Sequence, residues 1–239
     1  MRLKLICCDV FARLAYKTAA ESPHLVDLEL LPMLAHNEPD KLRDSLQEAI
    51  DRACNSQDKY ERIILAYGLC GNATAGLTSS LPLTIPRMHD CCAMFLGSQE
   101  KFLQDFGDRL SANWRTCGYM ERCRGSYAEA VNQYQTNPEY LKMVEEYGED
   151  NASYVWETLH PVIENAEGLY IEIDGYEYGG TKADYINQMQ EEGCPVETIQ
   201  GDAAWFIKMV NGPWDTSLFL DLSPGCKIEP VYDMKEVFC

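Results

Sequence analysis

Short apolar runs alternate with amphipathic stretches along the first part of the chain. The runs have the length and β-branched content of buried strands, and they span residues 3–8, 25–31, 62–67 and 81–86. Between the second and third runs, Asn37-Glu38-Pro39 opens a helix whose buried face is predicted to hold Leu42, Leu46, Ala49, Ile50 and Ala53. Regular alternation of strand and helix predicts a mostly parallel α/β lobe over residues 1–107.

The strand pattern is lost from residue 108 to 166, where large apolar residues recur at helical spacing. Alternation then resumes, with predicted elements at 169–174 (strand), 182–192 (helix), 196–199 (strand), 203–210 (helix) and 218–222 (strand). We therefore predict two Rossmann-like, mostly parallel α/β lobes, 1–107 and the smaller 167–239, with a helical insertion at 108–166. No low-complexity linker separates the lobes, so we expect an extensive interface between them.

Cysteines follow three of the predicted strands. Cys8 ends the first, Cys70 follows the third, and His89 and Cys91 follow the fourth. Carboxyl ends of parallel strands meet at one edge of a sheet, where open α/β sheets bind their ligands. Three cysteines and one histidine form a zinc ligand set, whereas three cysteines alone can hold a 4Fe-4S cluster. The sequence predicts a metal site made by Cys8, Cys70, His89 and Cys91, with zinc preferred and the 4Fe-4S cluster as the alternative.

The loop Tyr67-Gly68-Leu69-Cys70-Gly71-Asn72 is framed by glycines, which let a bound group approach the backbone closely. Gly68, Gly71 and Asn72 are therefore candidate cofactor contacts. Neighbouring cysteines should differ, because successive strand residues point to opposite faces. We expect Cys7 and Cys92 to pack in the core. The competing interpretation makes Cys8 and Cys70 core residues too, and His89 a hydrogen-bonded loop residue.

Three charged residues beside the proposed ligands are candidate catalytic groups. Arg87 could lower a thiol pKa or hold an anionic group of a substrate. Asp9 and Asp90 could orient His89 or carry protons. The ordinary alternatives are a salt bridge between Arg87 and one of these aspartates, and solvated carboxylates in an acidic chain.

Composition narrows the classes of function. The 239 residues include 20 Lys and Arg against 38 Asp and Glu, a formal charge of −18 that disfavours nucleic acid and anionic membranes as partners. The first apolar run ends at Asp9, too early for a signal peptide, and no run is long enough to span a bilayer. Eleven cysteines, an odd number, favour thiol or metal chemistry in the cytoplasm over a disulfide framework. The sequence contains neither a Walker loop nor a G-x-G-x-x-G motif, so it gives no support for nucleotide binding.

The sequence resembles the domain of unknown function family numbered 1638, found in anaerobic bacteria and archaea. The most specific matching stretches are Tyr67-Gly68-Leu69-Cys70-Gly71-Asn72 and Pro86-Arg87-Met88-His89-Asp90-Cys91. Shorter ones are Cys8-Asp9, 36–42, Leu96-Gly97-Ser98, Gly201-Asp202 and Pro224-Gly225. Asp9 stands where the family pattern leads us to expect Glu, and Gly118-Tyr119 where it leads us to expect Gly-Trp. The resemblance implies an association with corrinoid-dependent methyl transfer.

These observations predict a cytoplasmic metal-binding protein of anaerobic metabolism that acts in methyl or sulfur transfer linked to corrinoid-dependent methyltransferase systems. Its activity would be that of a metal-dependent transferase with a small-molecule substrate. A corrinoid is a further cofactor candidate, and a corrinoid protein or a methyltransferase a candidate partner. The alternatives are a non-catalytic protein that binds or delivers a metal or a corrinoid, and an iron–sulfur enzyme resembling desulfidases.

Overall fold

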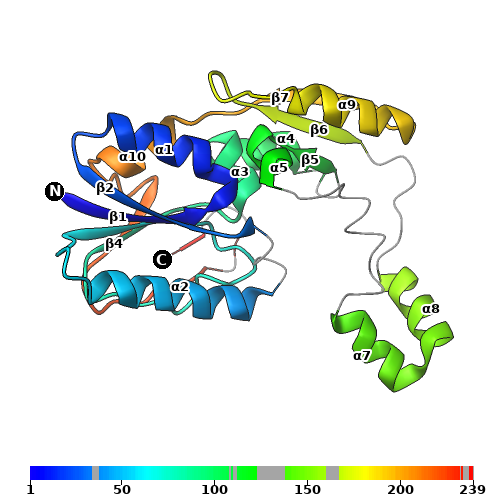
Figure 1. The fold of residues 1–239 in the computed structure, drawn as a ribbon, viewed down its shortest axis with the longest axis horizontal. Coiled ribbons are helices and arrows are strands. Elements are labelled where there is room, and N and C mark those ends of the chain that lie inside the picture. Colours follow the sequence, from blue (N-terminus) through cyan, green and yellow to red (C-terminus); the bar gives the residue numbers. More distant parts are fainter. Residues whose placement is uncertain are drawn as a thin grey trace.

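The computed structural model describes residues 1–33, 38–107, 109, 112–122, 138–159, 167–231, 233 and 237–238. Its larger sheet has the strand order β2-β1-β3-β4-β8 (Figure 1). The strands are β1 (Arg2–Cys8), β2 (Leu25–Leu31), β3 (Arg62–Ala66), β4 (Leu83–Pro86) and β8 (Phe219–Leu222). The first four are parallel, and β8 pairs antiparallel with β4. The predicted α/β class with parallel sheets is confirmed.

Helices cover both faces of this sheet. The helices α1 (Ala12–Glu21) and α10 (Ala204–Asn211) lie together on one face, and α2 (Pro39–Cys54) lies on the other (Figure 1). The five apolar residues predicted for the inner face of α2 are all buried, against Ile6, Ile63 and Leu65 of the sheet. Glu38 precedes the first helical residue and Pro39 occupies the first turn, where proline is well tolerated. Asn37, the predicted cap, lies outside the described residues.

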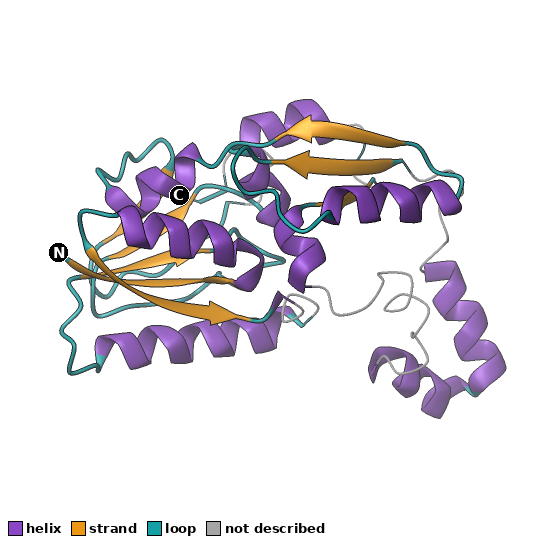
Figure 2. Ribbon diagram, turned by 45° about the horizontal axis from the view of Figure 1, so that its top comes forward, coloured by secondary structure: helices purple, strands orange, loops and turns teal. Residues whose placement is uncertain are grey.

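A smaller sheet is formed by three parallel strands in the order β5-β6-β7. They are β5 (Asn113–Arg115), β6 (Gly168–Glu172) and β7 (Val196–Gln200). Figure 2 shows this sheet beside the larger one, with a helix along it. That helix, α9 (Thr181–Glu191), packs Tyr185 and Met189 against Tyr170 of β6.

One hydrophobic core joins the two sheets. It contains residues of β1 and β3 together with Ile171 and Ile199 of the smaller sheet. Between the sheets lie η1 (Asp9–Phe11), α3 (Cys91–Leu96), α4 (Gln99–Phe106) and α5 (Cys117–Arg122). Phe11 stacks on Phe95 with ring centroids 4.4 Å apart. The two sheets therefore share one core.

Two strands differ from the predictions. Asn113–Arg115, expected within a helical insertion, forms β5 and pairs with β6. Three residues are too few to show the alternation by which a strand is recognised. The strand near 218–222 was expected in the smaller lobe but is β8 of the larger sheet, where it pairs with β4. This pairing joins segments distant in sequence, so local sequence patterns do not predict it.

The predicted insertion does contain helices. Residues 138–159 form α7 (Pro138–Tyr147) and α8 (Glu149–Leu159), which pack against each other apart from both sheets (Figures 1 and 2). Tyr140 of α7 meets Trp156 of α8 edge to face, with centroids 5.7 Å apart. Across the described part of the chain, no helix combines the length and apolar character needed to cross a membrane.

Candidate metal centre

The strand order places a topological switch point between the carboxyl ends of β1 and β3, and this position is called the crevice below. These strands are neighbours, but the chain leaves β1 through α1 on one face of the sheet and returns to β3 through α2 on the other. Crossovers that diverge in this way leave an open position, and α/β sheets bind ligands there. Cys8 is the last residue of β1, and Cys70 lies in the loop after β3. The sequence-predicted cysteines thus flank the switch point of the sheet.

The loops after β3 and β4 are held together by their backbones. Leu69 N donates to the Met88 carbonyl at 3.0 Å, and Cys70 N donates to the His89 carbonyl at 2.8 Å. A Cβ atom on Gly68 would lie 2.7 Å from the Met88 oxygen, so only glycine fits between the loops. The space beside Gly68, which was predicted as a cofactor contact, is filled by the backbone that follows β4. This packing brings Cys70 beside the segment that carries Cys91.

Cys70 has an unusual backbone conformation. Its φ angle is +47°, and Gly71 and Asn72 follow at +64° and +71°. The left-handed region costs a residue with a Cβ about 1 kcal/mol or more. A tight turn results, in which Ala73 N donates to the Cys70 carbonyl at 3.2 Å. The Asn72 carbonyl accepts a hydrogen bond from Arg43 Nη2 at 2.8 Å. The strain therefore falls on one of the predicted metal ligands.

Adjacent cysteines differ in burial, at the end of β1 and in the first turn of α3. Cys7 and Cys92 are fully buried in the core shared by the sheets. Cys8, Cys70 and Cys91 are partly exposed at the margins of the hydrophobic clusters.

The three partly exposed thiols also lie close to one another. Burial raises the pKa of Cys70 to about 12, with Asp90 and the Cys8 thiol adding to the effect. Burial likewise raises the pKa of Cys8 to about 12. The pKa of Cys91 is raised well above its ordinary value by burial, and then by Asp90, Cys70 and Cys8. Near pH 7 all three are neutral thiols in one crevice. No three Cys, His, Asp or Glu side chains of the described residues stand close enough to hold a metal ion in this arrangement.

Tyr67 is a residue of this crevice that sequence reasoning did not select. It is 3% exposed, and its hydroxyl has no hydrogen-bond partner among the described residues. Burial raises its pKa well above the ordinary value, with further contributions from Cys8, Cys7 and Cys70. Tyr67 looks like a core residue in sequence because it ends an apolar strand. Only the fold reveals an unsatisfied hydroxyl next to the thiols, a group that costs about 1–3 kcal/mol if it stays unpaired.

His89, the predicted fourth ligand, points its ring toward the C-terminal segment. Its Nε2 lies 2.8 Å from the Asp233 carbonyl, which can only accept, so Nε2 carries the proton. In the neutral ring the lone pair is then on Nδ1. Metal-binding histidines commonly donate their second nitrogen to a carbonyl in this way.

The predicted catalytic aspartates have structural partners. Asp90 caps α3 by accepting a hydrogen bond from Ala93 N at 3.0 Å, which fixes the start of the helix at Cys91. Burial raises the pKa of Asp90. Asp9 accepts from Met33 N at 2.9 Å and anchors the chain after β2. Both therefore position the segments that carry the cysteines.

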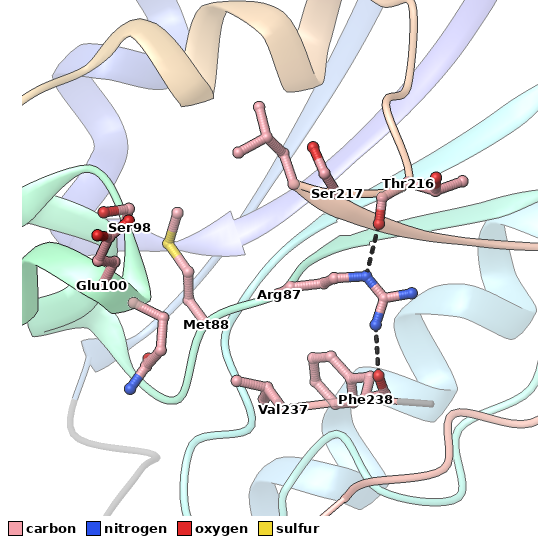
Figure 3. Close-up of a pocket in the computed structure, with 10 residues that line it drawn as sticks. Arg87, Met88, Ser98, Glu100, Thr216, Ser217, Val237 and Phe238 are labelled. Atoms are coloured by element: carbon pink, nitrogen blue, oxygen red, sulfur yellow. Dashed lines mark hydrogen bonds between the residues drawn. The ribbon is translucent and has the colours of Figure 1, made fainter. Parts of the chain in front are cut away.

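Arg87 binds main-chain carbonyls before β8 and near the C-terminus. Its Nε donates to the Thr216 carbonyl at 2.8 Å, and its Nη1 donates to the Phe238 carbonyl. The salt bridge to Asp9 or Asp90, one of the sequence alternatives, is not formed within the described part of the chain. Arg87 instead lines a cavity of about 510 Å³, shown in Figure 3, whose lining includes none of the three thiols.

The stretches that carry the family resemblance meet in space. Besides the contact of Gly68 with the Met88 segment, a Cβ on Gly97 would lie 2.8 Å from Asp202 Cβ, and Asp202 N donates to the Phe95 carbonyl at 3.1 Å. His36, in another of these stretches, lies outside the described residues. No curated protein and no solved structure matches the chain. A family model described as "Protein of unknown function (DUF1638)" matches residues 30–210, and the chain therefore belongs to that family.

Proposed function

We propose that the crevice at the switch point is a thiolate site for zinc or a 4Fe-4S cluster, with Cys8, Cys70 and Cys91 as ligands. The observation that carries the proposal is the proximity of these thiols, which follow three separate strands: Cys8 contributes to the raised pKa of Cys70, and both contribute to that of Cys91. Sulfur donors select soft and borderline metals. A bound group would also give the unpaired hydroxyl of Tyr67 a hydrogen-bond partner.

Binding would change the protonation and positions of these side chains. The thiols must lose their protons, so affinity should rise with pH. No three ligating atoms of the described residues are within metal-holding distance, so binding must also draw the side chains together. The Asp90 cap fixes Cys91, while the turn at Cys70 and the ring of His89 are the parts that could adjust. The Tyr67 hydroxyl would donate a hydrogen bond to a sulfur ligand or to a bound substrate.

The proposed activity is metal-dependent transfer of a methyl group or of sulfur, linked to corrinoid-dependent methyltransferase systems. A bound zinc ion or cluster would supply a Lewis acid that polarises a thiol or a sulfur-bearing substrate. The chain would contribute a partly buried crevice that limits access of water, and thiols that stay protonated until the metal arrives.

A second candidate is a carrier that binds a metal or a corrinoid and delivers it to a partner such as a corrinoid protein or methyltransferase. The position of the cavity beside Arg87 favours this candidate, because a catalytic metal needs a substrate pocket beside it. The 510 Å³ cavity is lined by none of the three cysteines. A carrier should release its metal to a chelator within minutes, whereas an enzyme should retain it through turnover.

The test is elemental analysis and visible spectroscopy of the chain purified without oxygen. Zinc, or iron with acid-labile sulfide and a brown colour, at about one site per chain supports the proposal. His89→Ala separates the two metals, because a zinc site of four protein ligands should lose affinity and a three-cysteine cluster should remain assembled. A metal-free, colourless and fully folded wild-type protein that also fails to take up either metal in reconstitution contradicts the proposal.

A further inference from the structure

The loop between β6 and α9, residues 174–180, has glycines near both of its ends. Their φ angles are +79° at Gly175, +68° at Gly179 and +78° at Gly180. A Cβ on Gly179 or Gly180 would meet no atom within 4 Å, so these two glycines serve the backbone conformation and not close packing. Small residues at the ends of a segment can absorb the large changes of backbone angle that a hinge needs.

Two tyrosine rings of this loop lie on cations of α1, in the other lobe. Arg13 Cζ is 3.8 Å from the centre of the Tyr178 ring, and Lys17 Nζ is 4.7 Å from that of Tyr176. The Arg13 guanidinium is itself held by Glu121 of α5, to which its Nε donates at 2.7 Å. Tyr178 is 44% exposed, and cation–ring contacts at exposed sites are weak. The loop is therefore fastened to α1 by contacts that break easily.

The same loop covers a cavity between the lobes. The cavity has a volume of about 20 Å³, and the loop lines it with Tyr176 and Glu177. Its apolar walls come from both lobes and are formed by Val10, Leu14, Phe95, Ile171 and Ile173. Cys117, the first residue of α5, also lines the cavity but is only 3% exposed. Its Sγ donates to the Tyr178 carbonyl at 3.8 Å, so the loop lies directly over this thiol.

We propose that the loop 174–180 is a lid that controls access from solvent to this cavity and to the thiol of Cys117. The closed cavity has room for about one water molecule, so a larger molecule enters only when the lid opens. On opening, Tyr176 and Tyr178 leave α1. Glu177 keeps the loop on its own lobe, because it accepts a hydrogen bond from the Tyr170 hydroxyl of β6 at 2.7 Å. The lid is separate from the thiol crevice and needs no metal.

The lid is tested by the rate at which iodoacetamide alkylates single cysteines of the full, folded chain, followed by mass spectrometry of its peptides. The exposed Cys226 gives the rate without protection, and Cys7, enclosed in the core, gives the rate of larger openings. Cys117 is nearly as buried as Cys7 but lies under the loop, so it should react at a rate between those of Cys7 and Cys226. Equal rates at Cys117 and Cys7 would overturn the inference.

Two variants at one position identify the contact that closes the lid. Tyr178→Leu removes the ring from Arg13, whereas Tyr178→Phe keeps a ring there and is the matched control. Loss of one exposed cation–ring contact should raise the alkylation rate of Cys117 about two- to fivefold. The rate at Cys7 should stay that of the parent, and Tyr178→Phe should behave like the parent at both cysteines.

Lys17→Met removes the cation beside the Tyr176 ring and should also speed alkylation of Cys117. Combined with Tyr178→Leu, the two factors should multiply, because both contacts close the same lid. The inference is overturned if Tyr178→Leu alkylates Cys117 no faster than Tyr178→Phe does. It is also overturned if Cys7 accelerates by the same factor as Cys117, since the variant would then loosen the whole lobe and not the loop.

Discussion

The carboxyl edges of the two sheets have the same place in the topology but different contents. At the smaller sheet, Gly118 after β5 and Gly201 after β7 allow the main chain of the other lobe to fill the edge. Their missing Cβ atoms would lie 2.0 Å from the Val10 oxygen and 2.5 Å from the Phe95 oxygen. At the larger sheet, the crevice holds partly exposed thiols, a strained Cys70 and the unpaired hydroxyl of Tyr67. The edge of the smaller sheet packs against the other lobe, whereas the edge of the larger sheet carries the features associated with function.

The largest expected effect on stability is at the docking edge. Gly118→Ala places a Cβ against a backbone oxygen that cannot rotate away, so the free energy of unfolding should fall by about 3 kcal/mol. Urea denaturation measures this change. Metal content per folded chain should remain that of the parent, because the thiol crevice is untouched. Unchanged stability would show that the two lobes are not docked as described.

A pH dependence should be specific to the thiol edge. In the folded, metal-free chain Cys8 and Cys70 keep their protons up to about pH 12, whereas unfolded thiols ionise near their ordinary pKa of 9.0. A raised pKa in the folded state stabilises it below pH 9, and this contribution is lost as pH rises from 9 to 12. Cys8→Ser and Cys70→Ser should each reduce the alkaline loss of stability measured in urea. Cys226→Ser, at an exposed thiol, should leave it unchanged, and equal slopes in all variants would contradict burial of the pair.

Removing one hydroxyl should have opposite effects in the two sheets. Tyr67→Phe removes an unpaired buried hydroxyl and should raise the unfolding free energy of the metal-free chain by about 1 kcal/mol. Tyr185→Phe removes a hydroxyl that donates to the Asn113 carbonyl in the smaller sheet, and should lower it by about the same amount. Equal destabilisation by both changes would mean that Tyr67 already has a partner.

The smallest effect concerns the backbone at Cys70. Alanine normally stabilises a chain relative to glycine, but at a φ of +47° glycine should be the more stable by about 1 kcal/mol. Comparison of Cys70→Gly with Cys70→Ala in urea measures this difference. The same pair of changes at Cys91, in the first turn of α3, should show the usual order. If alanine is favoured at both positions, Cys70 is not held in the left-handed conformation.

Much of the fold could be predicted because its signals are local. The run 25–31 and the inner face of α2 were predicted residue by residue, since strand length and helical spacing are visible in a short window. The pairing of β8 was not, because an antiparallel partner far along the chain leaves no local trace. The three-residue strand β5 was too short to recognise.

The candidate site shows the same limit. The convergence of Cys8, Cys70 and Cys91 was predicted from strand ends alone. The burial of Cys7 and Cys92 agrees with the prediction, but Cys92 is buried by its position in α3 and not by strand alternation. The unpaired hydroxyl of Tyr67 and the direction of Arg87 depend on what surrounds each side chain. Those surroundings are contributed by other loops and by the C-terminal segment, so no sequence pattern specifies them.

The central claim is that Cys8, Cys70 and Cys91 form a thiolate metal site. Metal content per chain after anaerobic reconstitution, in matched variants of adjacent cysteines, tests it most directly. Cys8→Ser and Cys91→Ser should lose most of the bound metal, while Cys7→Ala and Cys92→Ala should retain it, because those two thiols are enclosed in the core. Equal metal content in all four variants, or greater loss in Cys7→Ala and Cys92→Ala, would contradict the account.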